Sequence, residues 1–162
     1  MQIKYEPLEA GARRNAPKLI VVHSMGEFIL DPQPIHATDF LAKLGLSAHA
    51  LIAPDGTVYI CRDDDQGAYH ARGYNTDSLG VEFLVEGHHD YSTFLEAIKA
   101  DYITLDQWDA GIEAVKSWVE AYNVPRDKIV RHSDISPGRK VDPGAGFKWD
   151  KFITEVTNEK DI

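Results

Sequence analysis

The sequence predicts an α/β domain in which a central mixed β-sheet is flanked by helices, with a metal site at the strand ends. Short apolar runs typical of buried strands alternate along the chain with amphipathic stretches typical of helices, which is the pattern of layered α/β folds. The chain has 162 residues, of which 43% are hydrophobic. This length and composition suit one hydrophobic core, so residues 1–162 are expected to form a single domain.

Charge and composition narrow the classes of partner. The net charge of −9 disfavours a nucleic-acid partner, which clustered basic residues would attract. The N-terminus lacks the apolar run of a secretory signal, and no stretch reaches membrane-spanning length. We therefore expect a soluble monomer made in the cytoplasm, with no membrane partner.

Cys61 is the only cysteine, which excludes an intramolecular disulfide and a cysteine-based zinc finger, so we interpret it as a small buried hydrophobe.

The first predicted strand is the continuous apolar run at residues 18–22, typical of a strand buried on both faces of a sheet, and it ends at His23. His23 is a candidate metal ligand. The alternative is a histidine that caps the strand and bonds a backbone carbonyl. His132 also follows a short apolar run, at residues 129–130, so the two histidines could lie at neighbouring strand ends.

A helix and a hairpin are predicted next. Apolar residues recur at helical spacing from Ala37 to Leu44, and Gly45 provides a stop, so we expect an amphipathic helix that serves as scaffold. Residues 47–52 and 57–62 flank an Asp-Gly turn, which predicts a β-hairpin.

Residues 78–85 form another β-type run, whose interior carries a single charge, Glu82. A carboxylate between Val81 and Phe83 costs free energy unless it is paired or faces a cleft, and desolvation would raise its pKa toward the range of a general base. The alternative is a glutamate on the solvent side of an edge strand. Spacing alone leaves both open.

Residues 86–102 interrupt the pattern, and we interpret them as an insertion beside the cleft. His88 and His89 lie in this polar stretch and are interpreted as solvated. Thr104 and Gln107 form a capping-box pattern ahead of an apolar stripe, which predicts a helix that ends before Pro125. A terminal helix is expected at residues 149–156.

The segment from Arg131 to Gly144 combines metal-binding groups with two turns that contain proline, as an active-site loop would. His132 and Asp142 are ten residues apart on this loop and can converge on one cation. Zinc accepts histidine nitrogen and aspartate oxygen, and a catalytic zinc site uses three protein ligands. His23 is the candidate third ligand.

Five motifs together resemble the zinc-dependent N-acetylmuramoyl-L-alanine amidases, a family that includes cell-wall recycling amidases, phage endolysins and animal peptidoglycan recognition proteins. The resemblance covers about residues 18–152. The motifs occur in order at residues 21–23 (VVH), 47–49 (SAH) with 54–59 (PDGTVY), 69–71 (YHA), 78–82 (SLGVE), and 131–134 (RHSD) with 140–144 (KVDPG).

The resemblance implies hydrolysis of the amide bond between N-acetylmuramic acid and L-alanine in peptidoglycan or muropeptides, with Zn²⁺ as cofactor. It implies that His23, His132 and Asp142 hold the zinc. It also implies that Glu82 is the general base, that Lys140 stabilises the tetrahedral intermediate, and that His49 and His70 contact substrate. An alternative role for Lys140 is that of a solvated loop cation.

The chain departs from the family pattern at two places. Ala50 stands where the endolysins have a catalytic tyrosine, which gives Glu82 more weight, and Arg72 replaces the usual glycine after the Tyr-His-Ala motif. Two other functions remain open, a non-catalytic peptidoglycan-binding module and a protein-binding regulator. The enzyme would act on the cell wall if it is a phage endolysin, and in the cytoplasm otherwise.

Overall fold

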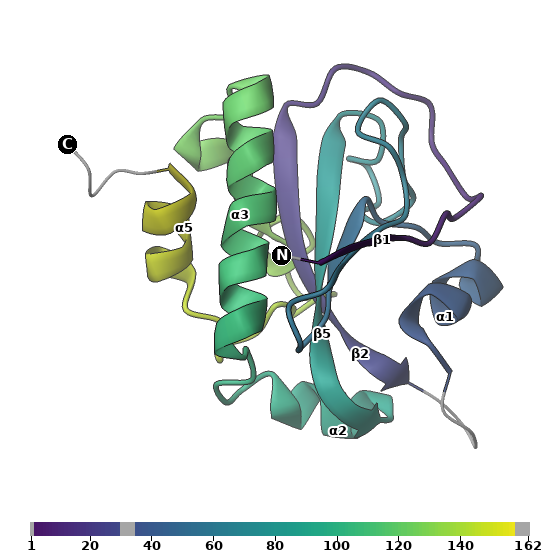
Figure 1. The fold of residues 1–162 in the computed structure, drawn as a ribbon, viewed down its shortest axis with the longest axis vertical. Helices are drawn as coiled ribbons and strands as arrows, with labels where there is room; N and C mark the ends of the chain where they lie inside the picture. The colour runs from purple at the N-terminus through teal and green to yellow at the C-terminus, as the bar shows by residue number, and fades with distance from the viewer. Residues whose placement is uncertain (1, 30–34, 158–162) are drawn as a thin grey trace.

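Six strands form one mixed β-sheet in the computed structural model, which describes residues 2–29 and 35–157 (Figure 1). The strands are β1 (Ile3–Tyr5), β2 (Leu19–Ile29), β3 (Ala50–Ile52), β4 (Val58–Ile60), β5 (Ser78–His89) and β6 (Ile129–Arg131). Their order in the sheet is β1-β4-β3-β5-β2-β6. Only β3 and β4 pair antiparallel, as the predicted hairpin requires, and all other neighbours are parallel.

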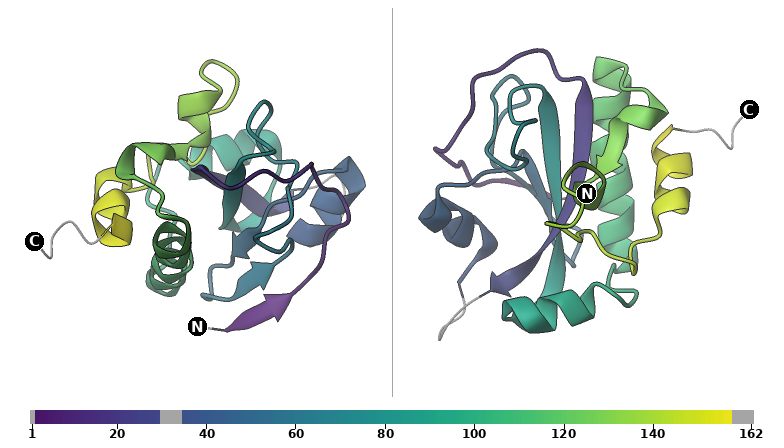
Figure 2. Two further views of the ribbon diagram at one scale, coloured as in Figure 1. Left: turned by 90° about the horizontal axis from the view of Figure 1, so that it is seen from above. Right: turned by 180° about the vertical axis from the view of Figure 1, so that it is seen from behind.

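Helices cover both faces of this sheet. They are α1 (Ala37–Leu44), α2 (Tyr91–Ala97), α3 (Leu105–Tyr122), α4 (His132–Ile135) and α5 (Trp149–Thr157), with a 3₁₀ turn at Arg126–Lys128. The helices α3 and α5 cover one face, while α1 lies on the opposite face (Figures 1 and 2). None of the helices in the described part of the chain is both long and apolar enough to cross a membrane.

The main core lies between the sheet and the pair α3 and α5. Val22 of β2 and Phe83 of β5 are fully buried there, and they pack in one cluster with Trp108 and Phe152. Successive side chains of a strand point to opposite faces of the sheet, so the residues next to Val22 and Phe83 in sequence point to the other face. His23 and Glu82 therefore share the face of the sheet that carries α1.

Local signals fixed the helix ends as expected. Gly45 adopts the left-handed conformation after α1, with φ 69°, and Thr104 and Gln107 form the predicted capping box at the start of α3. These features are confirmed because each depends only on residues within one turn of the helix end.

Two strand boundaries differ from the prediction. We expected β2 to end at His23 and the later strand to end at Val85, ahead of an interruption at residues 86–102. Instead β2 continues to Ile29 and β5 to His89. Both strands are longer because their extensions pair with each other, after an irregularity in register near Gly26. The flanking strands β3 and β6 stop earlier, so the central pair projects beyond them.

Candidate active site

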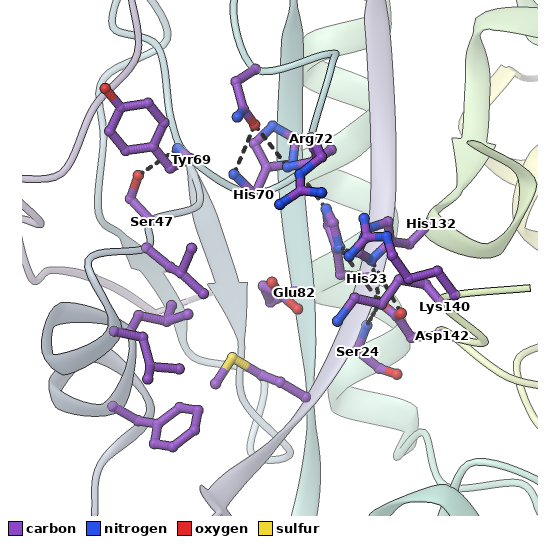
Figure 3. Close-up of a pocket in the computed structure, with 18 of the residues that line it drawn as sticks. His23, Ser24, Ser47, Tyr69, His70, Arg72, Glu82, His132, Lys140 and Asp142 are labelled. Atoms are coloured by element: carbon purple, nitrogen blue, oxygen red, sulfur yellow. Dashed lines mark hydrogen bonds and ion pairs between the residues drawn. The ribbon is translucent and has the colours of Figure 1, made fainter. Parts of the chain in front are cut away.

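His23, His132 and Asp142, selected from the sequence as metal ligands, converge in the structure (Figure 3). His23 lies on β2, His132 is the first residue of α4 directly after β6, and Asp142 lies in the loop that follows. One potential ligand atom from each lies within 4.8 Å of the other two, and all three residues are buried. We call them the His-His-Asp group.

Short distances join the members of this group. The Nδ1 atoms of His23 and His132 are 3.0 Å apart, and Nδ1 of His132 lies 3.1 Å from Oδ1 of Asp142. Oδ2 of Asp142 lies 3.4 Å from Nδ1 of His23 and accepts a hydrogen bond from the backbone nitrogen of Ser24 at 3.3 Å. Two imidazole nitrogens and one carboxylate therefore face a common point.

The protonation states of the group suit a metal ion. Burial lowers the pKa of His23, which keeps the ring neutral at pH 7. Burial alone would raise the pKa of Asp142, but its contacts with the rings of His132 and His23 hold it below its ordinary value. A neutral imidazole and an ionised carboxylate are the forms that bind a metal, and this set of ligands fits zinc.

Glu82 lies beside the group, on the neighbouring strand. In the parallel register of β2 and β5 it stands opposite His23, and its other neighbour is Leu51 of β3. Glu82 is 8% exposed, and it lines a cavity. Desolvation raises the pKa of Glu82 well above its ordinary value, the charge of Asp142 raises it further, and Lys140 opposes both.

The cavity in front of these residues has a volume of about 680 Å³. Its polar end holds the His-His-Asp group, Glu82 and Lys140, with Arg72 and Arg139 nearby on the lining. Its other side is an apolar wall, made of Phe40, Leu41, Leu44 and Leu46. We expected the helix at residues 37–44 to be scaffold only, but α1 also supplies three residues of this wall, Phe40, Leu41 and Leu44.

His70 reaches the cavity, but both of its ring nitrogens contact other side chains. Its Nδ1 lies 2.9 Å from Nε2 of His23, and its Nε2 lies 2.9 Å from Oγ of Ser78. The ring is steeply inclined to that of His23, with an angle of 78° between their planes. Burial, followed by the neighbouring histidines, lowers the pKa of His70 well below its ordinary value.

His49 does not reach the cavity. It is 1% exposed, its Nε2 lies 2.8 Å from the carbonyl oxygen of Gln66, and its Nδ1 accepts a hydrogen bond from the backbone nitrogen of Gly80. Burial lowers the pKa of His49 to about 4. The expected contact with substrate is therefore not supported by this placement, because both ring nitrogens bind the backbone.

Several residues of the site were not selected from the sequence. The sequence marks Ser78 only as part of a motif, although it is in phase with Glu82 on β5, and this alternation identifies it as facing the site. Arg139 and Tyr102 carry no such signal. The hydroxyl of Tyr102 donates to the carbonyl oxygen of Pro143 at 2.7 Å, which connects the segment expected to be an insertion with the loop of Asp142.

Comparison with known proteins agrees with this geometry. Residues 13–145 match the family model of the N-acetylmuramoyl-L-alanine amidases. The chain is 30% identical over 168 residues to the 1,6-anhydro-N-acetylmuramyl-L-alanine amidase AmpD of Enterobacter cloacae, covering 90% of this chain and 83% of that protein.

Two solved structures show the same fold. A selenomethionine derivative of AmpD has a TM-score of 0.72 and 25% identity, covering 96% of this chain and 94% of that one. The N-acetylmuramoyl-L-alanine amidase LysC from Clostridium intestinale has a TM-score of 0.71 and 23% identity, covering 98% of each chain. With the family model matched over most of its length, the chain belongs to the N-acetylmuramoyl-L-alanine amidase family.

Proposed function

We propose that this chain is a zinc-dependent amidase that cleaves the bond between the lactyl group of N-acetylmuramic acid and L-alanine. The observation that carries the proposal is the convergence of His23, His132 and Asp142 next to Glu82 in one cavity. The names of the relatives support 1,6-anhydro-muropeptides as the substrate. This would make the enzyme a recycling amidase rather than a lytic one.

The His-His-Asp group would hold the zinc through two nitrogens and one carboxylate. When bound, zinc would lower the pKa of a water molecule and polarise the scissile carbonyl. The raised pKa of Glu82 equips its carboxylate to accept a proton from the attacking water and pass it to the leaving amine.

The cations of the cavity would have separate tasks. Lys140 lines the cavity and its charge acts on Glu82, so it would stabilise the negative charge that develops on the carbonyl oxygen. Arg72 and Arg139 would attract the carboxylates of the stem peptide, since guanidinium groups pair well with carboxylates. The apolar wall would exclude water from the other side of the substrate.

The test is to incubate the zinc-loaded protein with soluble 1,6-anhydro-muropeptide and, separately, with intact sacculi, and to identify the products by mass spectrometry. We expect free stem peptide beginning with L-alanine, an intact sugar, and faster release from the soluble substrate. New reducing sugar ends without free peptide would indicate a glycosidase. Binding of muropeptide without any cleavage would indicate a receptor module, and either result would contradict the proposal.

A further inference from the structure

The hydrogen bonds around His70 have a defined direction, which bears on the metal site of the proposed function. We propose that His70 is a positioning residue: it holds the ring proton of His23 on Nε2, so that the lone pair of Nδ1 faces the metal. The role expected from the sequence, contact with substrate, would then be wrong for His70. The chain of groups runs from the carbonyl of Tyr74 through Ser78 and His70 to His23.

A backbone carbonyl determines which atom donates in the first hydrogen bond of this chain. The hydroxyl of Ser78 donates to the carbonyl oxygen of Tyr74 at 2.7 Å. A carbonyl can only accept, and a hydroxyl has one hydrogen, so Oγ of Ser78 must accept from its other partner. That partner is Nε2 of His70, 2.9 Å away.

The donor at Ser78 determines the proton positions of His70 and then of His23. Since Nε2 of His70 carries the proton, its Nδ1 is an acceptor in the neutral ring. The neighbour of that Nδ1 is Nε2 of His23, 2.9 Å away, which must therefore donate. The proton of His23 is then on Nε2, and its Nδ1, which faces His132 and Asp142, keeps a free electron pair.

The surroundings hold the His70 ring in place. The side-chain oxygen of Asn75 accepts hydrogen bonds from the backbone nitrogens of His70 at 2.9 Å and Ala71 at 2.7 Å. Gly80 lies directly against the ring, where a Cβ atom would come within 2.5 Å of its Nδ1. Figure 3 shows His70 above His23, on the side away from Asp142. A side chain at position 80 would therefore displace the His70 ring.

The tautomers can be read directly from the metal-free protein. Long-range ¹H–¹⁵N correlation spectra of the imidazole rings distinguish a proton on Nδ1 from one on Nε2. We expect the Nε2–H form for both His70 and His23, with the assignment made from His70→Leu and His23→Ala spectra. An Nδ1–H form of His70 would overturn the inference, whatever the protein does with zinc or muropeptide.

Zinc affinity is the second readout, measured by competition with a chromophoric chelator. His70→Leu should weaken zinc binding by about 10- to 100-fold, as expected for the loss of a hydrogen-bond partner of a metal ligand. His70→Gln should restore most of the affinity, because its amide can accept from His23 and donate to Ser78. Ser78→Ala should have a smaller effect in the same direction.

The matched control is His49→Gln, which alters a buried histidine whose ring centroid is 6.0 Å from that of His70 but whose nitrogens contact only the backbone. Its zinc affinity should equal that of the wild type. Unchanged zinc affinity in folded His70→Leu, with a raised KM for muropeptide, would make His70 a substrate contact and refute the inference. If the wild type binds no zinc at all, the proposed function fails, while the tautomer spectra still decide the direction of the chain.

Discussion

Glu82 is a buried carboxylate that costs the folded protein stability, so its removal should have opposite effects on activity and on stability. Glu82→Gln keeps the size of the side chain but cannot accept a proton, and turnover should fall by about 100-fold or more. Zinc content should be unchanged. Hydrolysis of muropeptide at a near-normal rate would mean that the general base lies elsewhere.

The same substitution should raise the free energy of unfolding of the metal-free protein at neutral pH. Desolvation raises the pKa of Glu82 in the folded state, so the folded protein holds this proton more tightly than the unfolded chain. Wild-type stability therefore falls as pH rises through the window between the two pKa values, and Glu82→Gln removes that loss. Urea titrations at several pH values would measure it, with the exposed Glu86→Gln on the same strand as a control.

The ligand assignment can be tested by elemental analysis. Purified protein should contain about one zinc, and His23→Ala and Asp142→Ala should each lower that content, because each removes one of three ligands. Asp134→Ala is the matched control, since Asp134 lies in the same segment and pairs with Arg131 instead. Undiminished zinc in both ligand variants would refute the site.

At the scale of elements, Gln107 joins α3 to strands β3 and β5 of the sheet. Its side-chain nitrogen donates to the carbonyl oxygens of Ile52 and Leu84, each at 2.8 Å, and it is fully buried. Gln107→Leu would leave both carbonyls without this donor, and unsatisfied buried groups cost about 1 to 3 kcal/mol each. We expect a loss of about 2 to 6 kcal/mol in urea unfolding, whereas the exposed Glu113→Leu on the same helix should change little.

The elements also show what a sequence can predict and why. The ends of α1 and α3 are determined by Gly45 and Thr104, each acting within one turn, so the pattern located them correctly. The extension of β5 to His89 depends on β2, about sixty positions earlier in the chain, and no local pattern reveals it. The contacts of His49 could not be predicted for a similar reason, since its motif gives its neighbours in sequence but not the backbone groups that its ring nitrogens contact.

At the scale of the whole molecule, the buried histidines predict a stability that depends on pH. Burial lowers the pKa of His23, His49 and His70 in the folded protein. In the unfolded chain these histidines take up protons near the ordinary histidine pKa of about 6.5, whereas in the folded protein they do not. The metal-free protein should therefore lose stability as pH falls below about 6.5, by up to about 1.4 kcal/mol per pH unit for each histidine.

For His49 this loss should continue down to about pH 4, the value of its folded pKa. Urea unfolding at pH 7.5, 6 and 5 would measure the trend, and His49→Gln should make the dependence shallower. Glu82 has the opposite effect on stability, since its raised pKa favours folding at low pH. The three histidines together should outweigh this single group. A flat or rising stability between pH 7.5 and 5 would contradict the prediction.

The alternation along β5 couples the core and the site. Leu79, Val81 and Phe83 enter the core beneath α3, while the residues between them, Ser78, Gly80 and Glu82, face the site side of the sheet. Losing or gaining a single residue in this strand would exchange the two sets and place a carboxylate among aromatic rings. A change of one residue in the length of β5 would therefore damage stability and chemistry together, because the same strand supplies residues to both.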